Sequence, residues 1–244
     1  MQQTQIMSLV NPKSLEAEAY RTLRTNLQFS TVAGELKSMV VTSTNASEGK
    51  STTMCNLAVS FAQTGKKVLL LEGDLRRPRL HTYLGLSNLH GISNVLAQNV
   101  PFQEVIQSTA LDIHVLTCGP IPPNPAELLN SNRFKELLEE LKQHFDLILI
   151  DAPPVGVVTD AAILSTLVDG TLMVVASHQT DRDRAIRAMK LLQNVGAKVL
   201  GTVLTMVPAD GKGYYGYQYY EYGANQSTKD TSVKKRRGVF SRLF

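Results

Sequence analysis

The chain of 244 residues has no tryptophan, only two cysteines and no long hydrophobic run. Its longest apolar stretches end at Asp151 and Ser177 after a few residues, far short of the roughly 20 that span a bilayer. Residues 1–11 are polar and lack the basic start and apolar centre of a secretory signal. Cys55 and Cys118 show no metal-ligand or disulfide spacing. We therefore expect a protein that stays in the cytoplasm.

Acidic residues are missing from the end of the chain. Five positive charges gather there, on Lys234, Lys235, Arg236, Arg237 and Arg242. Without these five, the net charge of +4 becomes −1, so the isoelectric point of about 9.0 does not describe a basic nucleic-acid-binding face. We expect no nucleic-acid partner. The basic segment itself fits either an anionic membrane surface or a solvated tail.

Short runs rich in Val, Ile and Leu alternate with amphipathic stretches of helical length. The runs cover residues 37–43, 67–71, 113–117, 147–150, 171–176 and 199–205, and the helical stretches cover 51–63, 133–144, 159–167 and 183–194. This alternation predicts right-handed crossovers and an α/β fold with a doubly wound, mostly parallel sheet. Asn124, Pro125 and Glu127 form a helix-start pattern with Asn124 as the N-cap.

The two ends of the chain differ in composition from its middle. Residues 14–29 carry apolar side chains about four positions apart, which is the spacing of an amphipathic helix. From about Pro208 the chain loses apolar periodicity and becomes rich in Gly, Tyr, Ser and Lys, which favours flexibility. We expect three parts. Residues 1–36 form an N-terminal segment that contains a helix, residues 37–208 form a nucleotide-binding domain, and residues 209–244 form a flexible tail.

The loop after the first expected strand is typical of phosphate binding. Residues 44–52 read Thr-Asn-Ala-Ser-Glu-Gly-Lys-Ser-Thr, a Walker A loop with Thr44 where the consensus has Gly. In such a loop backbone N–H groups surround the β-phosphate, Lys50 reaches the β/γ oxygens and the Ser51 hydroxyl ligates Mg²⁺. An ordinary helix start is the alternative, but the preceding strand and the following Thr52 favour the phosphate site. Its expected residues are Ser47, Glu48, Gly49, Lys50, Ser51 and Thr52.

Acidic residues follow two further expected strands. Glu72 and Asp74 come after residues 67–71, and Asp151 comes after residues 147–150. Because parallel strands end at the same edge as the phosphate loop, we expect these acids to converge there. Taken singly, each could be a turn residue or a helix cap. Together with Lys50 they favour a metal site in which Ser51, Asp74 and Asp151 bind Mg²⁺.

These elements, in this order, resemble the bacterial tyrosine kinases of capsule and exopolysaccharide systems over nearly the whole chain. The shared features are Asp74-Leu75-Arg76 in the second element, Glu18-x-x-Arg21-x-x-Arg24, the phrase Gly-Pro-Ile-Pro-Pro-Asn-Pro at 119–125 and a final tyrosine cluster. The resemblance implies a P-loop NTPase fold, ATP and Mg²⁺ as cofactors, and catalytic roles for Lys50, Glu72, Asp74, Arg76 and Asp151. The chain departs from the family's usual residues at Ala46, Ser47, Glu72 and Thr205, where many members have Pro, Gly, Asp and Asn.

Glu72 stands where the family usually has the first Asp of an Asp-x-Asp-x-Arg element, the base that accepts the proton of the attacking tyrosine. Glu has about the same basicity as Asp and one methylene more, so proton acceptance is retained and its reach changes.

Six of the eight tyrosines lie within nine positions, at Tyr214, Tyr215, Tyr217, Tyr219, Tyr220 and Tyr222. They are interspersed with glycines and lack the spacing of a folded core. A low-complexity adhesive tail is one interpretation. Beside a kinase site, a tail of phosphoacceptors is the better one. Each phosphate adds about −1.5 to −2 charges, so several would make neighbouring tails repel one another.

The charges of Glu18, Arg21 and Arg24 fall on one face of the expected N-terminal helix. They could be a solvated surface with intrahelical pairs. The resemblance implies instead an oligomerisation contact in a ring-like homo-oligomer, with phosphorylation between subunits. It also implies a separate transmembrane adaptor that activates the kinase and recruits it to the inner face of the membrane, and a tyrosine phosphatase that opposes it.

Two other functions remain open from the residues alone. A partitioning or division-site ATPase of the same P-loop branch binds ATP without phosphorylating protein, but it carries a Lys at the position of Asn45. A non-catalytic scaffold for polysaccharide assembly that still binds nucleotide is compatible with Thr44 and Glu72.

Overall fold

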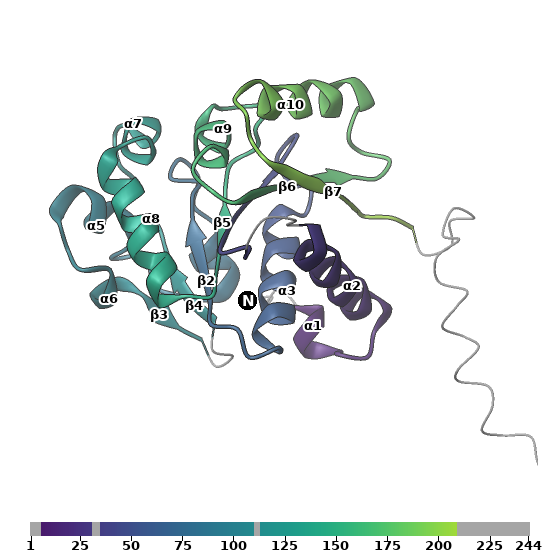
Figure 1. The fold of residues 1–244 in the computed structure, drawn as a ribbon, viewed down its shortest axis with the longest axis horizontal. Coiled ribbons are helices and arrows are strands. Elements are labelled where there is room, and N and C mark those ends of the chain that lie inside the picture. Colours follow the sequence, from purple (N-terminus) through teal and green to yellow (C-terminus); the bar gives the residue numbers. More distant parts are fainter. Residues whose placement is uncertain (1–5, 31–34, 110–112, 209–244) are drawn as a thin grey trace, which may run out of the picture. The chain divides into compact units, whose positions relative to one another are not determined.

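A seven-stranded sheet forms the centre of the protein, in the strand order β3-β4-β2-β5-β1-β6-β7 (Figure 1). The computed structural model describes residues 6–30, 35–109 and 113–208. Contacts group Met1–Val207 into one compact unit and Pro208–Phe244 into another, and every element described lies in the first. No helix within these described stretches is long and apolar enough to cross a bilayer.

The strands confirm the expected mostly parallel sheet. They are β1 Ser38–Ser43, β2 Val68–Glu72, β3 Gln107–Ser108, β4 Ile113–Leu116, β5 Leu147–Asp151, β6 Gly170–Ala176 and β7 Val199–Thr205. All neighbours pair in parallel except β3, which is antiparallel to β4. Only β3 was not predicted, because two polar residues carry no apolar periodicity.

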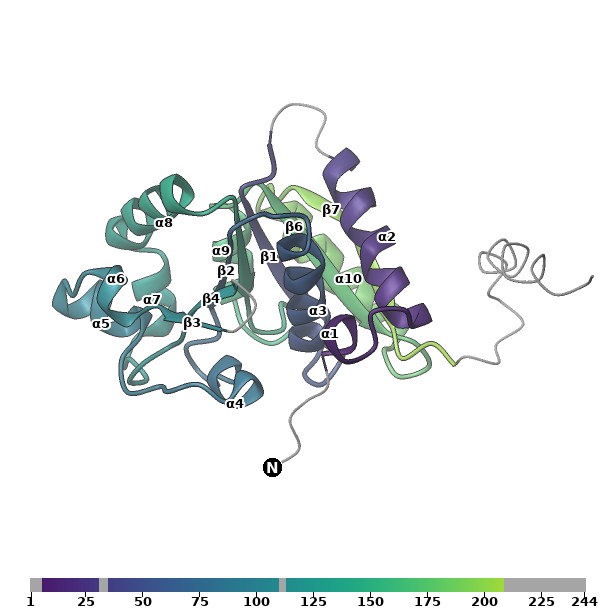
Figure 2. The same cartoon turned by 90° about the horizontal axis from the view of Figure 1, so that it is seen from below.

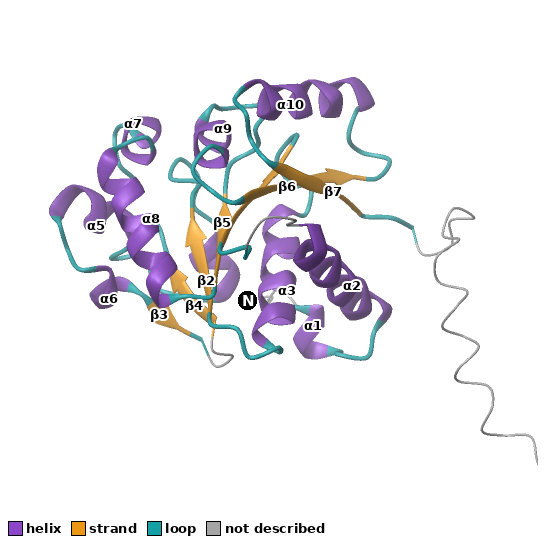
Figure 3. Ribbon diagram, viewed as in Figure 1, coloured by secondary structure: helices purple, strands orange, loops and turns teal. Residues whose placement is uncertain are grey.

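Helices cover both faces of the sheet (Figures 2 and 3). They are α1 Met7–Val10, α2 Leu15–Ser30, α3 Lys50–Ala62, α4 Leu80–Leu84, α5 Ile92–Gln98, α6 Phe102–Val105, α7 Pro125–Leu129, α8 Asn132–His144, α9 Asp160–Ser165 and α10 Arg182–Asn194. On one face α2, α3 and α4 contribute to one apolar cluster, and on the other face α5 to α10 contribute to a second. Within β1, Val40 faces the second cluster and its neighbours Met39 and Val41 face the first, which explains the continuous apolar run.

Helix ends follow the sequence in part. The helix α7 begins at Pro125 with Asn124 as its N-cap residue, as expected, although the Asn124 side chain makes no capping hydrogen bond. Side-chain caps are found elsewhere. Ser131 accepts from the N–H of Phe134 at 3.1 Å at the start of α8, and Asp181 accepts from that of Arg184 at 2.9 Å at the start of α10.

The helix α2 is attached to α3 by one of its charged residues. Arg24 donates to the Ser60 carbonyl at 2.7 Å, one of the carbonyls in the last turn of α3 that has no partner within its own helix. Arg21 instead pairs with Glu18 at 2.7 Å and donates to the Pro12 carbonyl at 2.9 Å. The three charges of this face therefore differ in role, and Arg24 holds two helices together.

Replacing Arg24 should loosen α2. We expect Arg24→Ala to lower the free energy of unfolding by about 1.5–3 kcal/mol, because a charge-assisted hydrogen bond to a backbone carbonyl is lost. Arg21→Ala is the matched control, with a loss of about 0.2–1 kcal/mol for a surface pair. Denaturant unfolding at several protein concentrations measures both and separates folding from assembly. Equal losses in the two variants would contradict this role of Arg24.

Candidate active site

The phosphate loop lies between β1 and α3, at the carboxyl end of β1, which is flanked in the sheet by β5 and β6. Two of its residues have left-handed backbone conformations, Ser47 with φ 63° and Gly49 with φ 84°. Glycine adopts such angles without steric cost, whereas Ser47 adopts them at a cost.

Glu48 stabilises the loop from within the protein. Its carboxylate is buried and accepts from the Thr44 N–H at 2.8 Å, from the Asn45 amide at 2.9 Å and from the Thr180 hydroxyl at 2.6 Å. The sequence predicted Glu48 as a phosphate-binding residue. Its side chain faces the protein, so only its backbone N–H is available for that role.

Thr205, at the end of β7, also contacts the loop. Its hydroxyl donates to the Glu48 carbonyl at 2.7 Å, and its side chain lies about 3.5 Å from the point where a Cβ of Gly49 would be. Thr205 thus supports the loop backbone. In the family that the sequence resembles, many members have Asn at this position. No local pattern indicates this contact, because Thr205 and Glu48 are far apart in the sequence.

Asp151 brings the metal-side residues together. The β1–β5 and β2–β5 registers place it beside Val41 and beside Glu72. Its two oxygens accept from the Lys50 ammonium at 2.5 Å and from the Ser51 hydroxyl at 2.6 Å. Burial opposes the positive charge of Lys50, but attraction to Asp151, with smaller contributions from Glu72 and Asp74, raises its pKa.

Glu72 is buried at the end of β2 and holds the following loop. Its carboxylate accepts from the N–H groups of Arg79 and Leu80, each at 2.9 Å, and from that of Asp74 at 3.2 Å. Burial, together with the negative charge of Asp151, raises the pKa of Glu72 to about 8, although the backbone hydrogen bonds act in the opposite direction. The predicted base is therefore next to the predicted metal ligand, as the sequence required.

Asp74 and Arg76 follow Glu72 in the loop after β2 and are less buried than it. Asp74 is half-buried and accepts from the N–H groups of Arg76 and Arg77 at 3.2 and 3.0 Å. Arg76 forms a two-pronged pair with Asp160, at 2.8 and 3.1 Å. Asp160 is fully buried at the start of α9, and this pair raises the pKa of Arg76. Sequence reasoning missed Asp160, which resembles an ordinary acid in the first turn of a helix.

The oxygen donors at this edge suit Mg²⁺. Within the described part of the chain, no three His, Cys, Asp or Glu side chains are grouped so that they could hold a metal by themselves. This agrees with a P-loop site, in which one or two protein oxygens act together with phosphate oxygens and water. The Ser51 hydroxyl and the Asp151 carboxylate supply such oxygens, and Asp74 follows the strand beside Asp151.

The structure therefore brings together Lys50, Ser51, Glu72 and Asp151, while Arg76 is directed to Asp160. The predicted phosphoacceptors, Tyr214, Tyr215, Tyr217, Tyr219, Tyr220 and Tyr222, lie outside the described residues.

The left-handed positions of the loop can be tested as a pair. We expect Ser47→Gly to raise the free energy of unfolding by roughly 0.5–1 kcal/mol, because relief of the left-handed backbone exceeds the added freedom of the unfolded chain. Gly49→Ala should lower it by about 1–2 kcal/mol for the opposite reason. Denaturant unfolding without nucleotide measures both. The idea fails if Ser47→Gly destabilises the protein.

The raised pKa of Glu72 predicts a pH dependence of stability. Between pH 4.5, the ordinary value, and about 8, folded Glu72 holds a proton that the unfolded chain has released. The free energy of unfolding should therefore fall as pH rises through this window. Glu72→Gln should make this fall shallower, and Glu104→Gln, at an exposed position of α6, serves as the control. Unfolding curves at pH 5, 6, 7 and 8 measure the slopes, and equal slopes in wild type and Glu72→Gln would contradict the assignment.

Comparison with known proteins agrees with this geometry. Residues 36–233 match the ParA family model, described as NUBPL iron-transfer P-loop NTPase. The tyrosine-protein kinase YwqD of Bacillus subtilis is 42% identical over 234 residues, which cover 96% of this chain and 95% of that protein.

Two solved structures are similar over most of the chain. The chimerical protein CapA2B2 is 39% identical with a TM-score of 0.80, over 83% of this chain and 90% of that one. The kinase domain of the Escherichia coli tyrosine kinase ETK is 33% identical with a TM-score of 0.81, over 88% and 85% of the two chains. The chain therefore belongs to this group of P-loop NTPases and, within it, to the bacterial tyrosine kinases.

Proposed function

We propose that this kinase transfers the γ-phosphate of ATP to the tyrosine cluster at 214–222 of a neighbouring copy. The observation that carries the proposal is the contact of one buried carboxylate, Asp151, with both Lys50 and Ser51, next to Glu72. Phosphoryl transfer needs mainly positioning and charge neutralisation, and these residues supply both at one sheet edge.

The phosphates would be held by the backbone N–H groups of residues 47–52 at the start of α3 and by Lys50. Ser51, Asp74 and Asp151 would hold Mg²⁺, which neutralises charge on the transferred group when it is bound. Lys50 and Ser51 are already directed to Asp151. Lys50 would have to leave Asp151 to reach the phosphate oxygens.

Glu72 would accept the proton of the attacking tyrosine. With a pKa of about 8 it is largely protonated at neutral pH as long as no additional positive charge lies near Asp151. Positive charge at the metal site lowers the pKa of a neighbouring carboxyl, so Glu72 becomes a carboxylate when the site is loaded. Proton acceptance would thus be restricted to the loaded enzyme.

The wider setting follows from the resemblance to the bacterial tyrosine kinases. We propose a ring-like homo-oligomer in the cytoplasm, with α2 and its Glu18, Arg21 and Arg24 at the subunit contact. A separate transmembrane adaptor would recruit it to the inner face of the membrane, and a tyrosine phosphatase would reverse the modification. Its role would be the regulation of capsular or exopolysaccharide synthesis and export.

Transfer between copies can be tested with two complementary variants of the full chain. A Lys50→Met chain keeps all tyrosines but should not transfer phosphate, and a chain with Phe at the six cluster positions keeps the site but lacks acceptors. We expect neither alone to gain phosphotyrosine at 214–222 with Mg-ATP. The mixture should gain it on the Lys50→Met copy only, as read by mass spectrometry.

The wild-type chain serves as the reference in the same assay. ATP hydrolysis without phosphotyrosine in either wild type or the mixture would favour the ATPase or scaffold function instead. Phosphotyrosine in wild type but not in the mixture would mean that transfer occurs within one chain.

A further inference from the structure

A cavity of about 540 Å³ lies beside the phosphate loop, on the side of the sheet that α10 covers. Its walls come from the start of the loop at Thr44 and Asn45, from Gly156 after β5, and from α10. It is distinct from the nucleotide edge, where Lys50 and Ser51 meet Asp151, since none of these three residues lines it. The volume lies within the range of about 300–1,000 Å³ that is typical of ligand sites.

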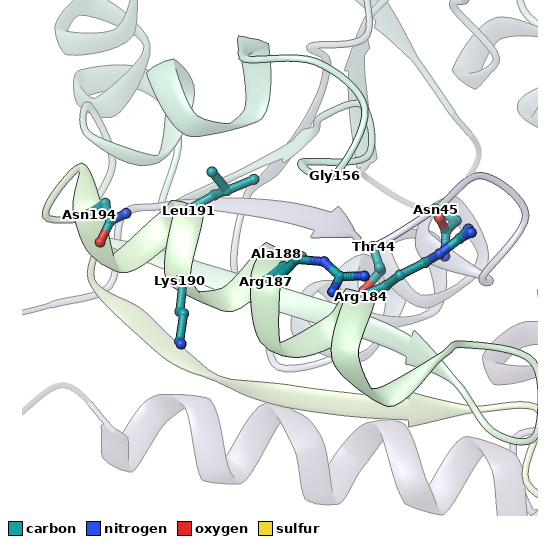
Figure 4. Close-up of a pocket in the computed structure, with 9 residues that line it drawn as sticks. All are labelled: Thr44, Asn45, Gly156, Arg184, Arg187, Ala188, Lys190, Leu191 and Asn194. Carbon is teal, nitrogen blue, oxygen red and sulfur yellow. The ribbon is translucent and has the colours of Figure 1, made fainter.

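Positive charge dominates the α10 wall. Figure 4 shows Arg184 and Arg187 extended toward Thr44 and Asn45, whereas Lys190 points away from them. Neither arginine forms an ion pair with any described residue. The nearby Asp181 is occupied as the helix cap. The two guanidinium groups are therefore available to an anion, and their planar donor set suits phosphate.

The opposite wall holds a hydroxyl group without a partner. Thr44 is only 2% exposed, and its Oγ1 is buried with no hydrogen-bond partner among the described residues. Its N–H is already bonded to Glu48, so a ligand oxygen could reach this wall only through a shift that exposes the buried hydroxyl. A buried hydroxyl without a partner is costly, and a ligand oxygen would satisfy it.

Gly156 keeps the two loops of this wall together. A Cβ at this position would lie 2.6 Å from the Thr44 carbonyl, so any larger residue would push the loop after β5 away from the phosphate loop. A ligand in the cavity thus contacts both loops that border the active site.

The rest of the lining is apolar. Ala188 is buried, and Leu191 is 46% exposed on the same side of α10 as the cavity. Two arginines without ion-pair partners beside a small apolar surface suit a ligand with a phosphate on an aromatic ring. A phosphotyrosyl side chain has both parts, whereas inorganic phosphate would leave the apolar surface uncovered.

We infer that this cavity binds a phosphotyrosyl side chain from the tyrosine cluster of another copy of the chain. The inference rests on the proposed function, which makes that product next to the cavity. Successive residues of an extended chain are about 3.3 Å apart, so a phosphotyrosine held here keeps the next tyrosines of the same cluster close to the site. The cavity would therefore retain the tail and promote modification of several tyrosines in one encounter.

Binding of synthetic peptides to the full chain tests this inference directly. Two fluorescent peptides cover residues 209–224. One carries a phosphate on Tyr217, and the other is its unphosphorylated counterpart. The protein carries Phe at its six cluster positions, so that its own tail does not compete. Fluorescence anisotropy without ATP should show at least about tenfold tighter binding of the phosphopeptide, as expected for charge-assisted hydrogen bonds.

Variants of α10 then locate the site. The double variant Arg184→Gln/Arg187→Gln should lose at least about tenfold in phosphopeptide affinity. Arg182→Gln, at an exposed arginine of α10 outside the cavity lining, should change it less than about twofold. Thermal melting and ADP binding verify that each variant is folded, which is expected because these arginines are exposed.

Three results would overturn the inference. They are equal binding of both peptides, unchanged affinity in the double variant, and competition by inorganic phosphate as effective as competition by free phosphotyrosine, which would indicate a site for free phosphate. Because the phosphopeptide is made chemically, the outcome does not depend on whether the chain phosphorylates itself. A kinase without this site would form phosphotyrosine but bind both peptides equally. A chain with the site but without kinase activity would bind the phosphopeptide more tightly and form no phosphotyrosine.

Discussion

The buried carboxylate of Asp151 is the constraint on which the site depends. It lies at the end of β5, and the parallel registers with β1 and β2 place the phosphate loop on one side of it and Glu72 on the other. Burying a carboxylate is costly, and contact with Lys50 and Ser51 offsets that cost. A shift of one residue in either register would turn side chains to the opposite face of the sheet. The order and register of the strands are thus what assembles the site.

The phosphate loop is also connected to β6 and β7, which lie on the other side of β1 from β5. Glu48 bonds to Thr180, which in turn accepts from the Ala176 N–H at the end of β6, and Thr205 of β7 bonds to the Glu48 backbone. The segment that leads into α10 is therefore connected to the loop by short hydrogen bonds. A change in the loop can reach α10 through these contacts, and a ligand on α10 can act on the loop in return.

Much of this could be predicted from local pattern. The strands and long helices follow from apolar periodicity, and the phosphate loop follows from Gly49, Lys50 and Ser51 between a strand and a helix. The short helices α1, α4, α5 and α6 were missed because so few residues carry no clear period. Contacts such as Arg76 with Asp160 join residues far apart in the sequence, and no local pattern encodes them. The same applies to Arg24, whose charge indicated a surface residue although its partner is a backbone carbonyl of α3.

The loop after β2 is fitted to Glu72, which stands where the family usually has Asp. Its carboxylate reaches the backbone of Asp74 on one side and of Arg79 and Leu80 on the other. The loop between them is therefore fitted to a side chain with one methylene more than Asp. A mutation to Asp would shorten that reach and could leave the buried N–H of Leu80 without an acceptor, at a cost of about 1–3 kcal/mol. An Asp at this position would therefore bind the loop less completely unless the backbone of residues 74–80 moved toward it.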